Sequence, residues 1–142
     1  SMLLLGGCSF NYTSYLNTAR YPLDRSYGLV PENPVCISNS GTESSRSIIE
    51  DFISRFSTGT FDEYQIINRR TIPNPLMIKP TTRKINNWTG KKLKYGTGPF
   101  LEEYSIKPTN GSGIIKIYFN TYKRNGRLYV PYGIGYGHLS GK

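Results

Sequence analysis

Two pairs of adjacent acidic residues are the first candidates for chemistry in this chain. They are Asp62-Glu63 and Glu102-Glu103. Paired carboxyl groups carry out general acid and base catalysis when their surroundings separate their pKa values. Adjacent residues of a strand point to opposite faces, however, so neither pair predicts a ready-made catalytic dyad. We expect these four side chains to be surface charges.

His138 is the second candidate, because it is the only histidine in the chain. In a basic protein it could act as the general acid of a metal-independent ribonuclease, with Lys116 or Arg127 binding the phosphate. The alternative is an exposed histidine without a role. Two cysteines and one histidine leave no residues for a zinc cluster. We therefore expect no metal and no cofactor, and a protein that is not an enzyme.

A mixture of tyrosines and cations towards the end of the chain is the strongest binding signal. Aromatic faces beside cations suit stacking on nucleobases or sugar rings and docking to an acidic protein. The alternative is that residues 11–39 or a second subunit cover these side chains. The candidate binding residues are Lys116, Tyr118, Tyr122, Lys123, Arg124, Arg127 and Tyr129.

Positive charge is concentrated in the second half of the chain. The net charge is +9, and residues 64–142 hold fourteen cations and two acids. Between Arg69 and Lys94 there are eight cations and no acid. Such a stretch predicts either a surface that attracts nucleic acid, lipid headgroups or an acidic protein, or a solvated face without a partner. The candidate binding residues in it are Arg69, Arg70, Lys84, Lys91 and Lys92.

These side chains need elements to position them, and the last third of the chain predicts a β-hairpin. Strands are expected over residues 114–122 and 127–136, because Asn125-Gly126 supplies the two positive φ angles of a type I′ turn. The outside of the hairpin is then expected to carry Lys116, Tyr118, Tyr122 and Tyr129. Its buried face is expected to hold Ile115, Ile117, Phe119, Thr121, Val130, Tyr132 and Ile134.

The register of this hairpin follows from its turn. Centring the loop on Asn125-Gly126 pairs Tyr122 with Tyr129. Every second residue on the outside of the second strand is then a glycine, which leaves a flat strip of backbone flanked by tyrosines.

One amphipathic helix is predicted over residues 45–57. Its apolar residues recur with the 3.6-residue period of a helix, Ser44 or Ser45 is expected to cap its start, and Gly59 is expected to end it. Before it, residues 11–39 predict an extended segment with at most one short strand, at residues 35–38. After it, strands are predicted within residues 61–68, 76–78, 91–95 and 101–106.

A short apolar run and two glycines precede Cys8 in residues 3–9, which read LLLGGCS. This pattern resembles the lipobox of bacterial lipoproteins. The resemblance implies that Cys8 carries a lipid, that residues 1–10 are a signal remnant and tether, and that the protein lies in the cell envelope, on the periplasmic side of the outer membrane. The alternatives are a disulfide between Cys8 and Cys36 or two free thiols.

The order of the expected elements also resembles a known fold family. A helix ending in FISRFSTGTFDEYQII, a proline-rich crossing, a WTGKKLKYG segment and two long closing strands resemble NTF2-like and cystatin-like proteins over residues 44–138. The resemblance implies an α+β fold, with one amphipathic helix packed on a curved antiparallel sheet and a C-terminal β-hairpin. A chain of 142 residues is about one domain, so residues 11–142 are expected to form it.

These observations favour a non-enzymatic lipoprotein of the cell envelope that binds an anionic partner. The partner would be an envelope protein, a lipid headgroup or a glycan, within a secretion, conjugation or immunity system. The alternatives are a basic secreted nuclease-type toxin domain and a nucleic-acid-binding module without catalysis.

Overall fold

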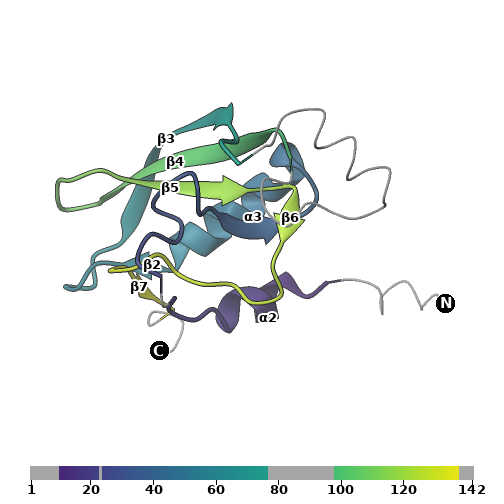
Figure 1. The fold of residues 1–142 in the computed structure, drawn as a ribbon. Helices are drawn as coiled ribbons and strands as arrows, with labels where there is room; N and C mark the ends of the chain where they lie inside the picture. Colours follow the sequence, from purple (N-terminus) through teal and green to yellow (C-terminus); the bar gives the residue numbers. More distant parts are fainter. Residues whose placement is uncertain (1–9, 23, 77–97, 138–142) are drawn as a thin grey trace, which may run out of the picture.

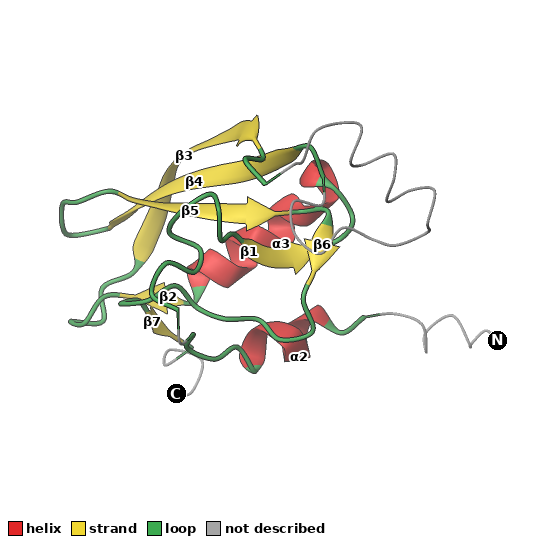
Figure 2. Ribbon diagram, viewed as in Figure 1, coloured by secondary structure: helices red, strands yellow, loops and turns green. Residues whose placement is uncertain are grey.

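The computed structural model describes residues 10–22, 24–76 and 98–137. Over these residues the chain forms two helices, a five-stranded sheet and a separate pair of short strands (Figure 2). The α+β class predicted from the sequence is therefore confirmed. Several predictions fall outside the described residues: the roles of Cys8, Lys84, Lys91, Lys92 and His138, and the strand at residues 91–95.

The elements are, in chain order, α2 (Tyr12–Asn17), β1 (Val35–Ser38), α3 (Thr42–Ser54), β2 (Phe56–Ser57), β3 (Tyr64–Pro73), β4 (Phe100–Pro108), β5 (Ile115–Asn120), β6 (Lys123–Arg124) and β7 (Gly135–Tyr136). The sheet has the order β3-β4-β5-β1-β6, and β2 pairs with β7. The pairing of β1 with β5 is parallel, so the sheet is mixed and not purely antiparallel as expected. Figure 1 shows α3 lying across one face of this sheet.

Helix α3 is the predicted amphipathic helix, shifted by three residues towards the N-terminus. Its N-cap is Gly41, at φ 88°, without a side-chain cap, and it ends at Ser54, with Arg55 as its C-cap. The predicted serine caps are wrong, because Ser45 is buried within the first turn and its hydroxyl lies 3.4 Å from that of Ser40. The predicted end at Gly59 is also wrong, since the chain becomes extended at Phe56 to pair with β7.

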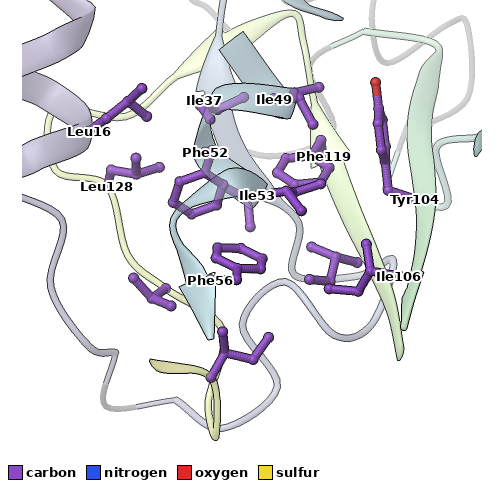
Figure 3. Close-up of a cluster of buried hydrophobic side chains, with 14 of the residues drawn as sticks. Leu16, Ile37, Ile49, Phe52, Ile53, Phe56, Tyr104, Ile106, Phe119 and Leu128 are labelled. Atoms are coloured by element: carbon purple, nitrogen blue, oxygen red, sulfur yellow. The ribbon is translucent and has the colours of Figure 1, made fainter. Parts of the chain in front are cut away.

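The core lies between α3 and one face of the sheet. Figure 3 shows Ile49, Phe52 and Ile53 pointing from α3 towards Phe119. The Phe52 ring stands edge-on to Phe119, with 6.1 Å between centroids. Fully burying a side chain of this size contributes about 1.5–3 kcal/mol. Ile117 and Phe119 are completely buried, which confirms the buried face predicted for this strand.

The segment before α3 departs from its prediction. Strand β1 is confirmed at Val35–Ser38, but residues 12–17 form helix α2 where an extended chain was expected. The Asn11 side chain accepts a hydrogen bond from the Ser14 backbone N–H at 3.0 Å and caps this helix. A helix of six residues is too short to show an apolar period in the sequence, so the pattern did not predict it.

The predicted C-terminal hairpin is wrong. Strand β1 lies between β5 and β6, so the two predicted strands do not pair, and Tyr129 instead bridges Arg20. Neither Asn125 nor Gly126 has the positive φ that a type I′ turn requires. Tyr132, predicted to be buried, is half exposed.

The physical reason lies in two segments of the sequence. Val35 and Ile37 of β1 are fully buried, and β1 occupies the position beside β5 that the hairpin partner would take. Pro131 stands in the middle of the predicted second strand and has no N–H to donate to a ladder. The chain after β6 therefore runs past α2 to β7 (Figure 1).

Candidate functional site

The face of the sheet that points away from α3, here called the outer face, carries a row of polar residues. The strand register places Arg70 of β3 beside Glu103 of β4, and Glu103 beside Tyr118 of β5. The next row contains Ser105 and Lys116. Residues alternate between the faces of a strand, so these side chains share one face, opposite that of Phe119.

Arg70 and Glu103 form the central contact of the outer face. Arg70 Nε donates to Glu103 Oε1 at 2.6 Å, and Nη2 donates to Oε2 at 3.4 Å. The Glu103 side chain is 4% exposed, whereas that of Arg70 is 59% exposed. The hydrogen bonds from Arg70 lower the pKa of Glu103, with a smaller contribution from Tyr118, against the raising effect of burial. Glu103 is therefore an ionised carboxylate that orients Arg70.

This orientation leaves hydrogen-bond donors of Arg70 facing solvent. A guanidinium has five N–H donors in a planar fork, and Glu103 takes two of them. Lys116 is exposed and makes no ion pair among the described residues. Its charge also contributes to lowering the pKa of Glu103. Arg70 and Lys116 thus present cationic donors on one face, which suits phosphate or carboxylate oxygens.

Tyr118 lies at the end of the row and completes it. Burial, and after it the neighbouring Glu103 carboxylate, raise the pKa of the Tyr118 phenol, which therefore stays protonated beside that carboxylate. The Tyr118 backbone N–H donates to the Gly28 carbonyl at 2.9 Å. Tyr118 is thus fixed by the sheet on one side and by the loop at residues 24–34 on the other.

The expectation that the four paired acids are surface charges is wrong for one pair. Glu102 and Glu103 are both buried, at 5% and 3% exposure. They do point to opposite faces: Glu102 accepts hydrogen bonds from Thr42 of α3 and Thr71 of β3, and Glu103 faces Arg70. Asp62 accepts two hydrogen bonds from Asn110. None of these arrangements brings two carboxyl groups together for acid–base catalysis.

Two of the predicted binding cations do not lie on the outer face, because they contact other segments of the chain. Arg69 points to the α3 side, where it forms an ion pair with Glu50 at 3.3 Å. Arg124 stacks on Phe10, with 3.6 Å from its guanidinium carbon to the ring centroid, and donates to the Tyr12 hydroxyl. Phe10 and Tyr12 therefore cover Arg124.

Four more of the predicted binding residues contact other parts of the chain. Arg127 donates to the Thr18 carbonyl at 3.4 Å. Tyr129 packs edge-on against Tyr27, with ring centroids 5.7 Å apart. Lys123 lines a separate cavity, and Tyr122 packs so closely on Gly98 that a Cβ there would collide with its ring.

Within the described part of the chain, no three His, Cys, Asp or Glu side chains gather as metal ligands. The helices described are also too short to cross a membrane.

Comparison with protein-family models, curated proteins and solved structures finds no match. The function is therefore argued from the residues themselves.

The cavity beside the outer face is a feature that the sequence analysis missed. It has a volume of about 530 Å³ and lies between the loop at residues 24–34 and the ends of β1, β5 and β6. Asp24 accepts hydrogen bonds from the Ser26 backbone N–H and hydroxyl, at 2.9 and 2.8 Å. This Asp-x-Ser turn is a recognisable sequence signal and could have located one wall of the cavity.

Proposed function

We propose that this chain is a non-enzymatic binding module of the bacterial cell envelope, held at the membrane by a lipid on Cys8, whose outer face binds an anionic partner. The supporting observation is the row formed by Arg70, Glu103 and Tyr118, next to the exposed Lys116. Glu103 holds Arg70 in a fixed orientation, so little conformational entropy is lost when a further anion binds its outer donors.

The charge of the whole sequence supports the same proposal. Residues 77–97, outside the described part of the chain, contain six cations and no acid. Only three residues separate this segment from the end of β3, the strand that carries Arg70. Positive charge of this density attracts anionic surfaces over roughly 8–10 Å at physiological ionic strength.

Among the anionic partners expected from the sequence, a lipid headgroup is the one that the proposed lipid on Cys8 favours most directly. A single acyl chain gives marginal and reversible membrane binding, and a basic surface is the usual second signal. The resemblance to NTF2-like and cystatin-like domains remains part of this proposal. The packing of α3 on the sheet supports it, and the parallel pairing of β1 with β5 departs from it.

Vesicle co-sedimentation tests the outer face. Wild-type protein is expected to bind vesicles of phosphatidylglycerol and phosphatidylcholine at low salt, and not vesicles of phosphatidylcholine alone. Lys116→Gln is expected to weaken binding about fivefold, because a cation at an anionic surface contributes about 1 kcal/mol. Arg20→Gln removes the same charge from an exposed residue outside the five-stranded sheet, and is expected to have little effect. Absence of binding, or an equal loss in both variants, would refute the proposal.

Mass spectrometry of the protein isolated from its native membrane tests the tether. The peptide that contains Cys8 is expected to carry the added mass of a lipid. An unmodified Cys8 in the native protein would remove the tether and leave the outer face as the sole membrane contact.

A further inference from the structure

Strand β3 forms one edge of the five-stranded sheet (Figure 1). Within the described part of the chain, β4 is the one strand that pairs with β3 in this sheet, so the other side of β3 is an open edge. The side chains of residues 67–71 are all exposed. An open edge of this kind presents backbone N–H and C=O groups with which a further strand can pair.

Part of this edge is regular. The register between β3 and β4 shifts between Ile66 and Asn68, which leaves Ile67 outside the register. From Asn68 to Pro73 each residue has one partner in β4, without a further shift. A bulge bends and twists a strand and interrupts its pairing. Residues 68–73 are therefore the stretch of β3 onto which another strand fits.

This stretch is cationic. Strand β3 contains Arg69 and Arg70 and no acid. The Arg70 side chain is 59% exposed, whereas that of its partner Glu103 is 4% exposed, so the positive member of this ion pair faces solvent. Opposite charges on neighbouring strands attract each other, and like charges directly opposite repel. The open edge of β3 therefore favours a strand that carries negative charge.

The pairing of β3 with β4 shows how a glutamate fits opposite Arg70. Glu103 is the register partner of Arg70 and accepts two of its five N–H donors. A glutamate opposite Arg70 in a strand added on the other side would meet the remaining donors. Neighbouring residues of a strand point to opposite faces, so the residue next to this glutamate would share the face of Arg69. Two adjacent glutamates in an extended segment thus match the two arginines.

A second copy of this chain fits the open edge less well than an acidic strand does. Antiparallel pairing of two copies over residues 68–72 would place Arg70 of one copy directly opposite Arg70 of the other. Like charges in this position destabilise a strand pair. The two arginines therefore disfavour self-association of β3 and leave its edge available to a partner of opposite charge.

We propose that the open edge of β3 binds an extended acidic segment of a partner protein, which adds to the sheet as a further strand with two adjacent glutamates opposite Arg69 and Arg70. This interaction goes beyond the proposed membrane function, because the backbone of β3 supplies the hydrogen bonds and no lipid is required. Vesicle binding and peptide binding are measured separately, so either proposal can fail while the other holds.

Amide NMR of the isotope-labelled full chain tests the proposal, with the acetylated and amidated peptide TVEEVT as the probe. The peptide is expected to bind with a Kd of about 1 mM, and the largest shift changes are expected at residues 68–72. TVQQVT is expected to bind about two- to fivefold more weakly for each charge pair lost. TVKKVT, which places like charges opposite the arginines, is expected not to bind. Absence of shift changes at residues 68–72 at peptide concentrations well above this Kd would overturn the proposal.

A proline peptide separates strand pairing from charge attraction. TPEEPT keeps both glutamates, but its prolines at the second and fifth positions remove one N–H from each edge of the peptide. It is expected to bind about tenfold more weakly than TVEEVT, as for the loss of one backbone hydrogen bond. Equal binding of TVEEVT and TPEEPT would show attraction between charges without strand addition, and would refute the proposal.

Variants of the protein assign the charge. Arg69→Gln is expected to weaken the binding of TVEEVT about two- to fivefold and to leave that of TVQQVT unchanged. Arg20→Gln is the matched control, because it removes the same charge from an exposed residue outside the five-stranded sheet. An equal loss in both variants would show an effect of net charge and would contradict the assignment to β3. Thermal unfolding of each variant separates a lost contact from a lost fold.

Discussion

Replacing Gly28 by alanine is expected to destabilise the protein strongly, because this glycine occupies a position that no other residue fits. Gly28 has φ +75°, in the left-handed region. A Cβ built on it would lie 2.9 Å from Val35 Cγ2 and 3.0 Å from Pro131 Cγ. Val35 is fully buried and Pro131 is also buried, so neither has space to move away.

The magnitude follows from these two effects. An alanine in the left-handed conformation costs about 1–2 kcal/mol. Forcing an extra methyl group into a packed core costs about 1–3 kcal/mol. The free energy of unfolding should therefore fall by about 2–5 kcal/mol, which is a large part of the 5–15 kcal/mol typical of a folded domain.

Urea unfolding followed by far-ultraviolet circular dichroism measures this loss. Gly126→Ala is the matched control, because Gly126 is exposed, has no positive φ, and would place its Cβ in open space. The control is expected to stay within about 0.5 kcal/mol of the wild type. If Gly28→Ala were as stable as Gly126→Ala, the packing of the loop at residues 24–34 against β1 would be refuted.

Two further predictions concern the core and the outer face. Phe52→Ala is expected to lower the free energy of unfolding by about 3–5 kcal/mol in the same urea assay, since Phe52 is completely buried against Phe56 and Phe119. Arg70→Gln is expected to lower the urea midpoint at pH 7, because it removes the main cause of the lowered pKa of Glu103. A lowered pKa in the folded state stabilises above the unfolded glutamate pKa of about 4.3, and this contribution is lost as the pH falls through the folded value. The difference between Arg70→Gln and wild type should therefore close below pH 4, and a difference that stays constant with pH would contradict the ion pair.

The sequence predicted those parts of the fold that a local pattern determines. The apolar period of α3 identified Ile49, Phe52 and Ile53 as buried residues, and all three are in the core. The alternation of β5 identified Ile117 and Phe119 in the same way. Both patterns are local, because the period of a helix or a strand decides which of its residues lie on the same face.

The hairpin failed because strand pairing is not a local property. Asn-Gly favours a tight turn, but it cannot exclude a third strand from the position next to β5. The apolar segment at β1, about 80 residues earlier in the chain, takes that position through parallel pairing of Val35 with Phe119. Of the local signals, Pro131 was the one that argued against a second long strand.

The candidate site could be predicted in part for the same reason. Lys116 and Tyr118 were both expected on the outside of the sheet, and the structure places them there. The partner of Arg70 could not be predicted, because the contact joins residues 33 positions apart on two different strands. Glu103 was expected to be a surface charge, but it is buried. It lies on β4 between β3 and β5, and the pattern of a single strand does not predict this arrangement.

Tyr118 lies between the outer face and the loop at residues 24–34, and its two contacts belong to different parts of the residue. Its phenol lies beside Glu103 in the row that orients Arg70, whereas its backbone N–H donates to the Gly28 carbonyl. A side-chain replacement such as Tyr118→Phe therefore leaves the bond to the loop in place and changes the outer face alone. An effect of Lys116→Gln on vesicle binding at an unchanged urea midpoint would likewise assign that effect to the charge of the outer face and not to a lost fold.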